Sequence, residues 1–61
     1  MKFSNALQLV ADGTIKATGE VMRVVGTPEV RNWCGQQIVR ITAKDAFGRT
    51  HVFTHKEVLP A

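Results

Sequence analysis

Few side chains in this sequence could act as a nucleophile or a base: one cysteine and two histidines, Cys34, His51 and His55. Cys34 stands beside Gly35 in a segment that predicts a loop, so its thiol could be exposed. Nucleophilic catalysis needs a base within reach of the thiol and a third group that orients the base. Nothing in the pattern brings a histidine to Cys34, so we expect no enzyme activity and interpret Cys34 as an incidental loop cysteine.

The two histidines also raise the question of a metal site. His51 and His55 are four residues apart, a spacing that places two ligands on one face of a helix. Here the interval spans a strand end and a turn, where the spacing loses that meaning. We therefore expect no metal site and no cofactor, with one histidine at the margin of the core and the other exposed in the turn.

A basic, threonine-rich set of residues is the candidate surface for nucleic acid. Charged heads and hydroxyls on a rigid sheet are the groups that contact phosphates. Arg31 and Trp33 alternate onto one side of a short strand, where they could add a cation and a stacking surface for an unpaired base. The competing interpretations are a solvated sheet face and a core position for Trp33, and we favour the core for this residue. The candidate nucleic-acid-binding residues are Arg23, Arg31, Trp33, Arg40, Thr42, Lys44 and Thr50.

A β-hairpin must position most of these residues. Ile38–Lys44 and Arg49–Thr54 alternate in polarity, which is typical of half-buried strands. Between them, Asp45 suits the first position of a type I turn and Gly48 the last, so the segment predicts a three-residue loop with a glycine bulge. This turn pairs Asp45 with Arg49, Lys44 with Thr50, Ala43 with His51, Thr42 with Val52, Ile41 with Phe53 and Arg40 with Thr54.

That register separates a core face from a wet face. Val39, Ile41, Ala43 and Phe53 form the core face, with His51 at its margin. The wet face carries Arg40, Thr42, Lys44, Thr50, Val52 and Thr54. We expect Asp45 and Arg49 to form an exposed ion pair across the turn, with a contribution of about 0–1 kcal/mol to stability.

Other elements flank the hairpin. Thr54 and Glu57 form a capping-box pattern, which predicts a single helical turn before a short strand at Val58-Leu59. Upstream, residues 14–25 predict one strand bent at Gly19, with Met22 and Val24 toward the core. Residues 29–33 predict a further short strand.

Residues 1–13 form an apolar segment with two possible structures. Asn5 to Gln8 reads as a capping box and Gly13 as a helix end, which predicts a short helix. Asp12-Gly13 is equally a two-residue hairpin signal. We choose the helix, which would lie on the barrel or on a partner. An alternative protein interface would use Phe3, Leu7, Val10 and Val52.

Length and charge limit the possible functions. The 61 residues make one small domain with a thin stability margin, which a partner protein or a second copy could complete. One cysteine allows no internal disulfide, and no apolar run of about 18 residues predicts a membrane helix. With no signal-peptide pattern, we expect a cytoplasmic protein. The net charge of +3 permits an anionic partner without requiring one.

The order of long strand, loop, strand, tight turn, strand, helical turn and short strand over about residues 18–60 resembles an SH3-like small barrel. Thr54-His55-Lys56-Glu57-Val58-Leu59 stands in the place of the short helix and last strand of such barrels. The Ala-Leu-Tyr-Asp-Tyr signature of peptide-binding SH3 domains is absent, as is the glycine pattern of KOW modules. Residues 18–25 with 45–49 also resemble part of an oligonucleotide-binding fold, our second choice.

We therefore predict a mainly β domain over residues 1–61: a four- to five-stranded SH3-like barrel at 14–61 after a short N-terminal helix. We favour nucleic-acid binding through the basic face, with a protein-interaction or assembly role as the alternative. Convergence of Arg23, Arg31, Arg40 and Lys44 on one surface would favour the first. Pairing of these cations with Glu20, Glu29 or Glu57 would favour the second.

Overall fold

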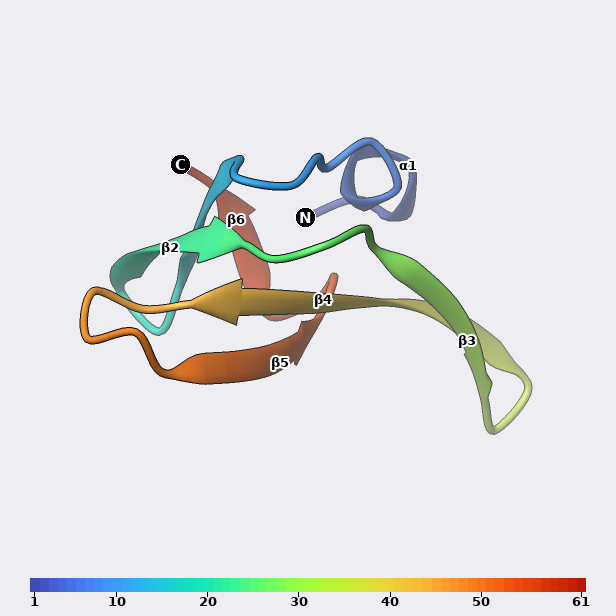
Figure 1. Ribbon diagram of the computed structural model, residues 1–61. Helices are drawn as coiled ribbons and strands as arrows, with labels where there is room; N and C mark the ends of the chain where they lie inside the picture. The colour runs from blue at the N-terminus through green and yellow to red at the C-terminus, as the bar shows by residue number, and fades with distance from the viewer.

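The computed structural model describes residues 1–61 as a curled antiparallel sheet with one short helix (Figure 1). The helix is α1 (Phe3–Ala6), and the strands are β1 (Thr14–Ala17), β2 (Glu20–Val24), β3 (Glu29–Trp33), β4 (Gln36–Lys44), β5 (Thr50–Thr54) and β6 (Val58–Pro60). The predicted mainly β class is confirmed. The helix is far too short to cross a bilayer.

β4 is the strand on which the sheet is built. It pairs with β3 along its first half, with β2 at Ala43 and Lys44, and with β5 along its other edge. β2 continues to β1, and β1 to β6, so β3, β5 and β6 end the sheet as a half-barrel. The path β6-β1-β2-β4-β5 is compatible with the predicted SH3-like topology. β3 is an additional strand that follows β2 and precedes β4 along the chain and pairs with β4 alone.

The β4–β5 hairpin has the predicted register. Arg40 pairs with Thr54, Ile41 with Phe53, Thr42 with Val52, Ala43 with His51 and Lys44 with Thr50. At the turn, the Asp45 N–H donates to the Arg49 carbonyl at 3.0 Å and the Gly48 N–H to the Asp45 carbonyl at 3.1 Å. Gly48 has φ +80°, as a glycine bulge requires. The three-residue loop is confirmed.

One apolar cluster forms the core, and most of it lies on the inner face of the sheet. Val39, Ile41, Ala43 and Phe53 are buried as predicted, and His51 is half-buried at the edge. Met22 and Val24 of β2 are buried too, which confirms the predicted inner side of this strand. The core comprises Ala6, Ile15, Ala17, Met22, Val24, Val39, Ile41, Ala43, Phe53 and Val58.

Residues 14–25 form two strands, so the prediction of one bent strand is wrong. Thr18 and Gly19 both have positive φ, 51° and 78°, and Ala17 pairs with Glu20 across them. Two successive left-handed residues make the two-residue hairpin turn that matches strand twist. Threonine rarely adopts this conformation, so the sequence indicated only a bend at Gly19. The strand count is therefore six.

The N-terminal helix is real but shorter and earlier than predicted. It spans Phe3–Ala6, follows Lys2 without a side-chain cap, and buries Ala6. The backbone at 12–13 is instead bonded to β2: the Asp12 N–H donates to the Val24 carbonyl at 2.9 Å, and the Val24 N–H to the Gly13 carbonyl at 2.8 Å. This pairing prevents a helix from reaching Gly13, because the same backbone groups cannot serve both structures.

His55 is buried, with 7% of its surface exposed, so the prediction of an exposed turn histidine is wrong. Its Nδ1 accepts the Val39 N–H at 3.1 Å, and its own N–H donates to the Val39 carbonyl at 2.9 Å. The Phe3 ring packs edge-on against it, with the ring centroids 5.5 Å apart. His55 thus takes over from β5 as the partner of β4 where the hairpin ladder ends.

The predicted capping box forms in part. The Glu57 Oε1 accepts the Thr54 N–H at 3.2 Å, as the motif requires. The Thr54 hydroxyl donates to the same Oε1 at 3.1 Å instead of accepting the Glu57 N–H, which goes to the Thr54 carbonyl at 3.0 Å. The turn delivers the chain to β6, where Val58 pairs with Ala17.

Replacing His55 tests the bond to β4. We predict that His55→Phe leaves the buried Val39 N–H without an acceptor and lowers the free energy of unfolding by about 1–3 kcal/mol. His55→Asn, which keeps an acceptor near the Nδ1 position, should lose less. Urea denaturation measures both, with the exposed Lys56→Ala as control. Equal losses in the two His55 variants would contradict the acceptor role.

Gly48 tests the turn. We predict that Gly48→Val destabilises the fold by about 1 kcal/mol or more, because a β-branched residue is strained at positive φ. No atom lies within 4 Å of a Cβ placed there, so the cost is backbone strain and not a clash. Gly48→Asn, which tolerates this conformation better, should melt closer to the parent. A Gly48→Val melt identical to the parent would exclude this turn geometry.

Candidate functional site

A row of polar side chains crosses four strands on the outer face. Arg23 of β2 pairs with Lys44 of β4, and the row is extended by Thr14 of β1 and Thr50 of β5. All four side chains are exposed. Cross-strand partners lie about 4.5–5.5 Å apart at their Cβ atoms, so the sheet holds two cations side by side between two hydroxyls.

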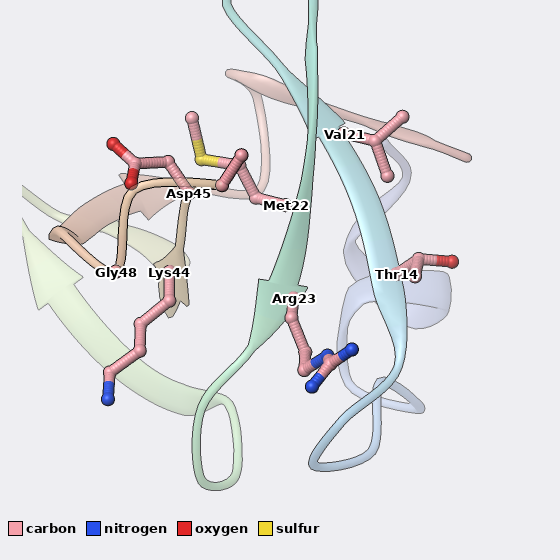
Figure 2. A pocket seen from close by; sticks show the side chains of 8 residues that line it. Thr14, Val21, Met22, Arg23, Lys44, Asp45 and Gly48 are labelled. Atoms are coloured by element: carbon pink, nitrogen blue, oxygen red, sulfur yellow. The ribbon is translucent and has the colours of Figure 1, made fainter.

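A groove of about 410 Å³ lies at this row. Figure 2 shows Arg23 and Lys44 extending toward the same side from neighbouring strands, while the Asp45 carboxylate points the opposite way. The two cations form no ion pair with any acid of the chain, since the ion pairs present are Arg31–Glu29 and His51–Asp45. The groove is lined by Thr14, Val21, Met22, Arg23, Lys44, Asp45, Ala46 and Gly48.

The one acid at the groove is engaged inside the turn. The Asp45 Oδ1 accepts the N–H groups of Phe47 and Arg49, both at 2.9 Å, and its Oδ2 lies 2.8 Å from the His51 Nε2. The hydrogen bond from His51, then that from the Arg49 N–H, holds the pKa of Asp45 below its usual value. Because this carboxylate is committed to the turn, the positive charge of Arg23 and Lys44 is left open to a ligand.

This geometry corrects the predicted Asp45–Arg49 ion pair. Arg49 contributes its backbone N–H and not its guanidinium, and the side chain that meets the carboxylate is the His51 ring. The bulged turn folds the chain over the carboxylate, so nearby N–H groups reach it first. His51 is brought there by its pairing with Ala43, two strand positions from the turn.

Phe47 is a site residue that the sequence analysis missed. It lies at the tip of the β4–β5 turn and is 84% exposed, between Ala46 and Gly48, which both line the groove. An exposed aromatic ring in the turn that borders the groove is a stacking surface for an unpaired base. The signal was present, because a residue in the middle of a three-residue hairpin loop has no core to face.

The other candidates lie further along β4. Arg31 donates to the Glu29 Oε2 at 2.8 Å, so it is paired with an acid. Arg40 is exposed opposite Glu29, and Thr42 is half-buried between Arg40 and Lys44. The predicted basic face is therefore divided, with Arg23, Lys44 and Thr50 at one end, Arg31 and Trp33 at the other, and Arg40 and Thr42 between them.

Trp33 is 69% exposed, so the core position favoured for it is wrong. It ends β3, whose five residues are all exposed. Figure 1 shows the β3–β4 hairpin extending beyond the body of the molecule. The whole chain, with this hairpin, measures 35 × 20 × 18 Å. No second layer covers this arm, so a tryptophan there has nothing to pack against.

The residues of the alternative interface do not form one patch. Phe3 is half-buried against the core, while Leu7 and Val10 are exposed after α1. Val52 is exposed on β5, and Figure 1 draws α1 and β5 on opposite sides of β4. A single partner surface cannot be built from these residues together.

Cys34 and the histidines are kept apart by the fold. The thiol is exposed in the turn between β3 and β4, whereas His51 lies beside the β4–β5 turn at the other end of β4. No group of three or more His, Cys, Asp or Glu side chains is placed to hold a metal ion.

Comparison with protein-family models, with curated proteins and with solved structures gives no match to this chain. Any function for this chain must therefore be inferred from the groove, the arm and their chemistry.

The Asp45 turn makes a prediction about pH. Because the pKa of Asp45 is lowered in the folded state, its stabilising contribution is present above the ordinary value of 3.8 and is lost as pH falls through the lowered value. We predict that the melting temperature of the parent exceeds that of Asp45→Asn at pH 5 and that the gap narrows toward pH 2. Thermal melts across this range measure it. A gap that stays constant would show that the charge of Asp45 does not hold the turn.

Proposed function

We propose that this protein binds nucleic acid without catalysing a reaction, and that the groove of Arg23 and Lys44 holds the phosphate backbone. The observation that carries the proposal is the pair of neighbouring cations without acidic partners, beside an acid that is engaged elsewhere. Phosphate oxygens are the ligands that lysine and arginine heads and hydroxyls on a sheet most often meet in nucleic-acid complexes.

The exposed ring of Phe47 supports a single-stranded ligand. Unpaired bases present π faces that stack on aromatic side chains, and base–aromatic stacking contributes about 1–3 kcal/mol per base. Ala46 and Gly48, the neighbours of Phe47 in the turn, line the groove, so we place a base of the strand held at the two cations on the Phe47 ring. No helix is available to enter a major groove, since the one helix is four residues long.

The outer face of β4 supplies a path for a longer strand. Its nine residues span about 30 Å at ~3.3 Å per residue, from the turn that carries Phe47 to the hairpin that carries Trp33. Arg40 and Thr42 lie along this path, so the residues predicted from the sequence keep a role as secondary contacts. Two aromatic side chains at its ends would favour sequence-tolerant binding of several nucleotides.

The proposal extends to the class of barrel and to its setting. We assign the half-barrel to the SH3-like group because of its strand order and of the turn before β6. A cytoplasmic setting fits the single exposed thiol of Cys34, which a reducing compartment would keep free.

A protein-interaction role is the second candidate, and it has its own observation. Of the four arginine and lysine residues considered as phosphate contacts on the strands, Arg31 is paired with an acid, Glu29, on the exposed strand β3. Because its arginine is already paired with an acid, β3 is a weaker phosphate contact than the groove, and its exposed surface is better suited to a protein partner.

Charge reversal in the groove tests the proposed function. We predict that Arg23→Glu with Lys44→Glu weakens binding of a fluorescent single-stranded oligonucleotide at least ten-fold. The slope of log affinity against log salt should also fall by about 1.4, or roughly 0.7 for each lost phosphate contact. Fluorescence anisotropy at several salt concentrations measures both, and Phe47→Ala should weaken binding without changing the slope.

The matched control is Lys2→Glu with Lys56→Glu, which makes the same change in net charge on exposed residues away from the groove. This control should bind close to the parent. Equal weakening in the two double variants would show that binding depends on net charge and not on the groove. Unchanged binding by the folded groove variant would overturn the proposal.

A further inference from the structure

β3 is an edge strand without any visible protection by a neighbouring element. It pairs with β4 and with no other strand, and all five of its residues are exposed. A free edge presents unpaired backbone N–H and C=O groups that can add a strand from another chain. Which of these groups face outward, and which side chains flank them, decides what kind of strand would fit.

The bonds of Val39 show which backbone groups of β3 face the free edge. Both polar groups of Val39 are bonded to His55, on the β5 side of β4. Val39 therefore makes a non-hydrogen-bonded pair with Val30, its partner on β3. In an antiparallel ladder such pairs alternate with bonded ones, so the N–H and C=O of Val30 point outward, whereas those of Glu29 and Arg31 point to β4.

The side chains around Val30 are complementary to their own copy. Glu29 precedes Val30 and Arg31 follows it, on the same face of the sheet. In a two-fold antiparallel pairing centred on Val30, Glu29 lies opposite Arg31 of the second copy, and Arg31 opposite Glu29 of the second copy. Val30 then faces Val30 of the second copy and exchanges both backbone bonds with it.

Other registers fail on charge or on bonding. Centring on Glu29 or Arg31 would oppose like charges and would need backbone groups that already face β4. Centring on Asn32 would satisfy the alternation, but it would place Val30 against the Cys34–Gly35 turn and leave no ion pairs across the seam. The Val30 register alone agrees with both the backbone and the charges.

We propose that the free edge of β3 is a homodimer interface, in which two copies pair antiparallel about Val30 and join their sheets. Pro28 lies opposite Asn32 of the second copy in this register and has no N–H to give, so the ladder ends there. A two-fold contact uses the same surface on both copies and closes on itself, so it yields dimers and not filaments. The interface is short, and micromolar, concentration-dependent association is expected.

Sedimentation equilibrium over micromolar to millimolar concentrations tests the proposal, which does not depend on nucleic-acid binding. The parent should form a dimer. Glu29→Arg alone and Arg31→Glu alone should each weaken dimerisation at least ten-fold, because each opposes like charges twice across the seam. When the two single variants are mixed in equal amounts, dimerisation should recover. A dimer of one chain of each variant has opposite charges at both facing pairs of the seam.

The mixture separates pairing between chains from stability within a chain. Each single variant keeps its internal like-charge contact after mixing, so recovery can come only from the seam. Val30→Pro removes the outward N–H and leaves the bonds to β4, so it should give a folded monomer, as circular dichroism and sedimentation will show. A parent that stays monomeric throughout, or a mixture no more associated than its components, would overturn the proposal.

Discussion

The turn at Asp45–Gly48 decides which way every residue of β4 and β5 faces. Its carboxylate gathers two backbone N–H groups and the His51 ring, and its glycine takes the positive φ that sets a three-residue loop. A loop one residue longer would move each cross-strand pair and exchange the two faces of β5. Because β4 pairs with three strands, this register extends through most of the sheet.

The length of β4 has a second consequence. The strand is longer than the core beneath it, so its first half leaves the body with β3 and forms an arm in water. His55 marks the boundary: it completes the bonding of Val39 where β5 stops and closes the core with the Phe3 ring. Beyond that point neither strand has a layer to pack on, which explains why Trp33 and Val30 are exposed.

The two ends of β4 therefore present different chemistry. One end offers the neighbouring cations Arg23 and Lys44 in an open groove, with the exposed Phe47 ring in the adjoining turn, and this suits a single strand of nucleic acid. The other end offers the free backbone edge of β3, flanked by opposite charges, and this suits β3 of a second copy. If both proposals hold, a dimer would carry two grooves in a fixed relation, and a long single strand could engage both with higher avidity than one.

Local pattern was enough to predict the β4–β5 hairpin, because turn chemistry and period-two alternation act over a few residues. The same holds for the strand at 29–33, the turn at Thr54–Glu57 and the inward side of Met22 and Val24. The sequence also predicts Arg23 and Lys44 as members of a basic face. Their meeting at one groove was not predicted, since it depends on β2 pairing with β4 from 21 positions away.

Only the tertiary structure decided which backbone groups find their partners outside the regular strands and which apolar side chains are left exposed. The sequence carried no sign that Thr18 would adopt a left-handed conformation, that residues 12–13 would bond to β2, or that His55 would serve β4. The Thr18 conformation follows from the pairing of Ala17 with Glu20. The bonds of residues 12–13 and of His55 satisfy backbone groups of β2 and β4 that have no other partner, and which groups those are depends on how the strands are placed. The exposure of Trp33 was likewise decided by the tertiary structure: its hydrophobicity is plain from the sequence, but no second layer covers the end of β3 where it lies.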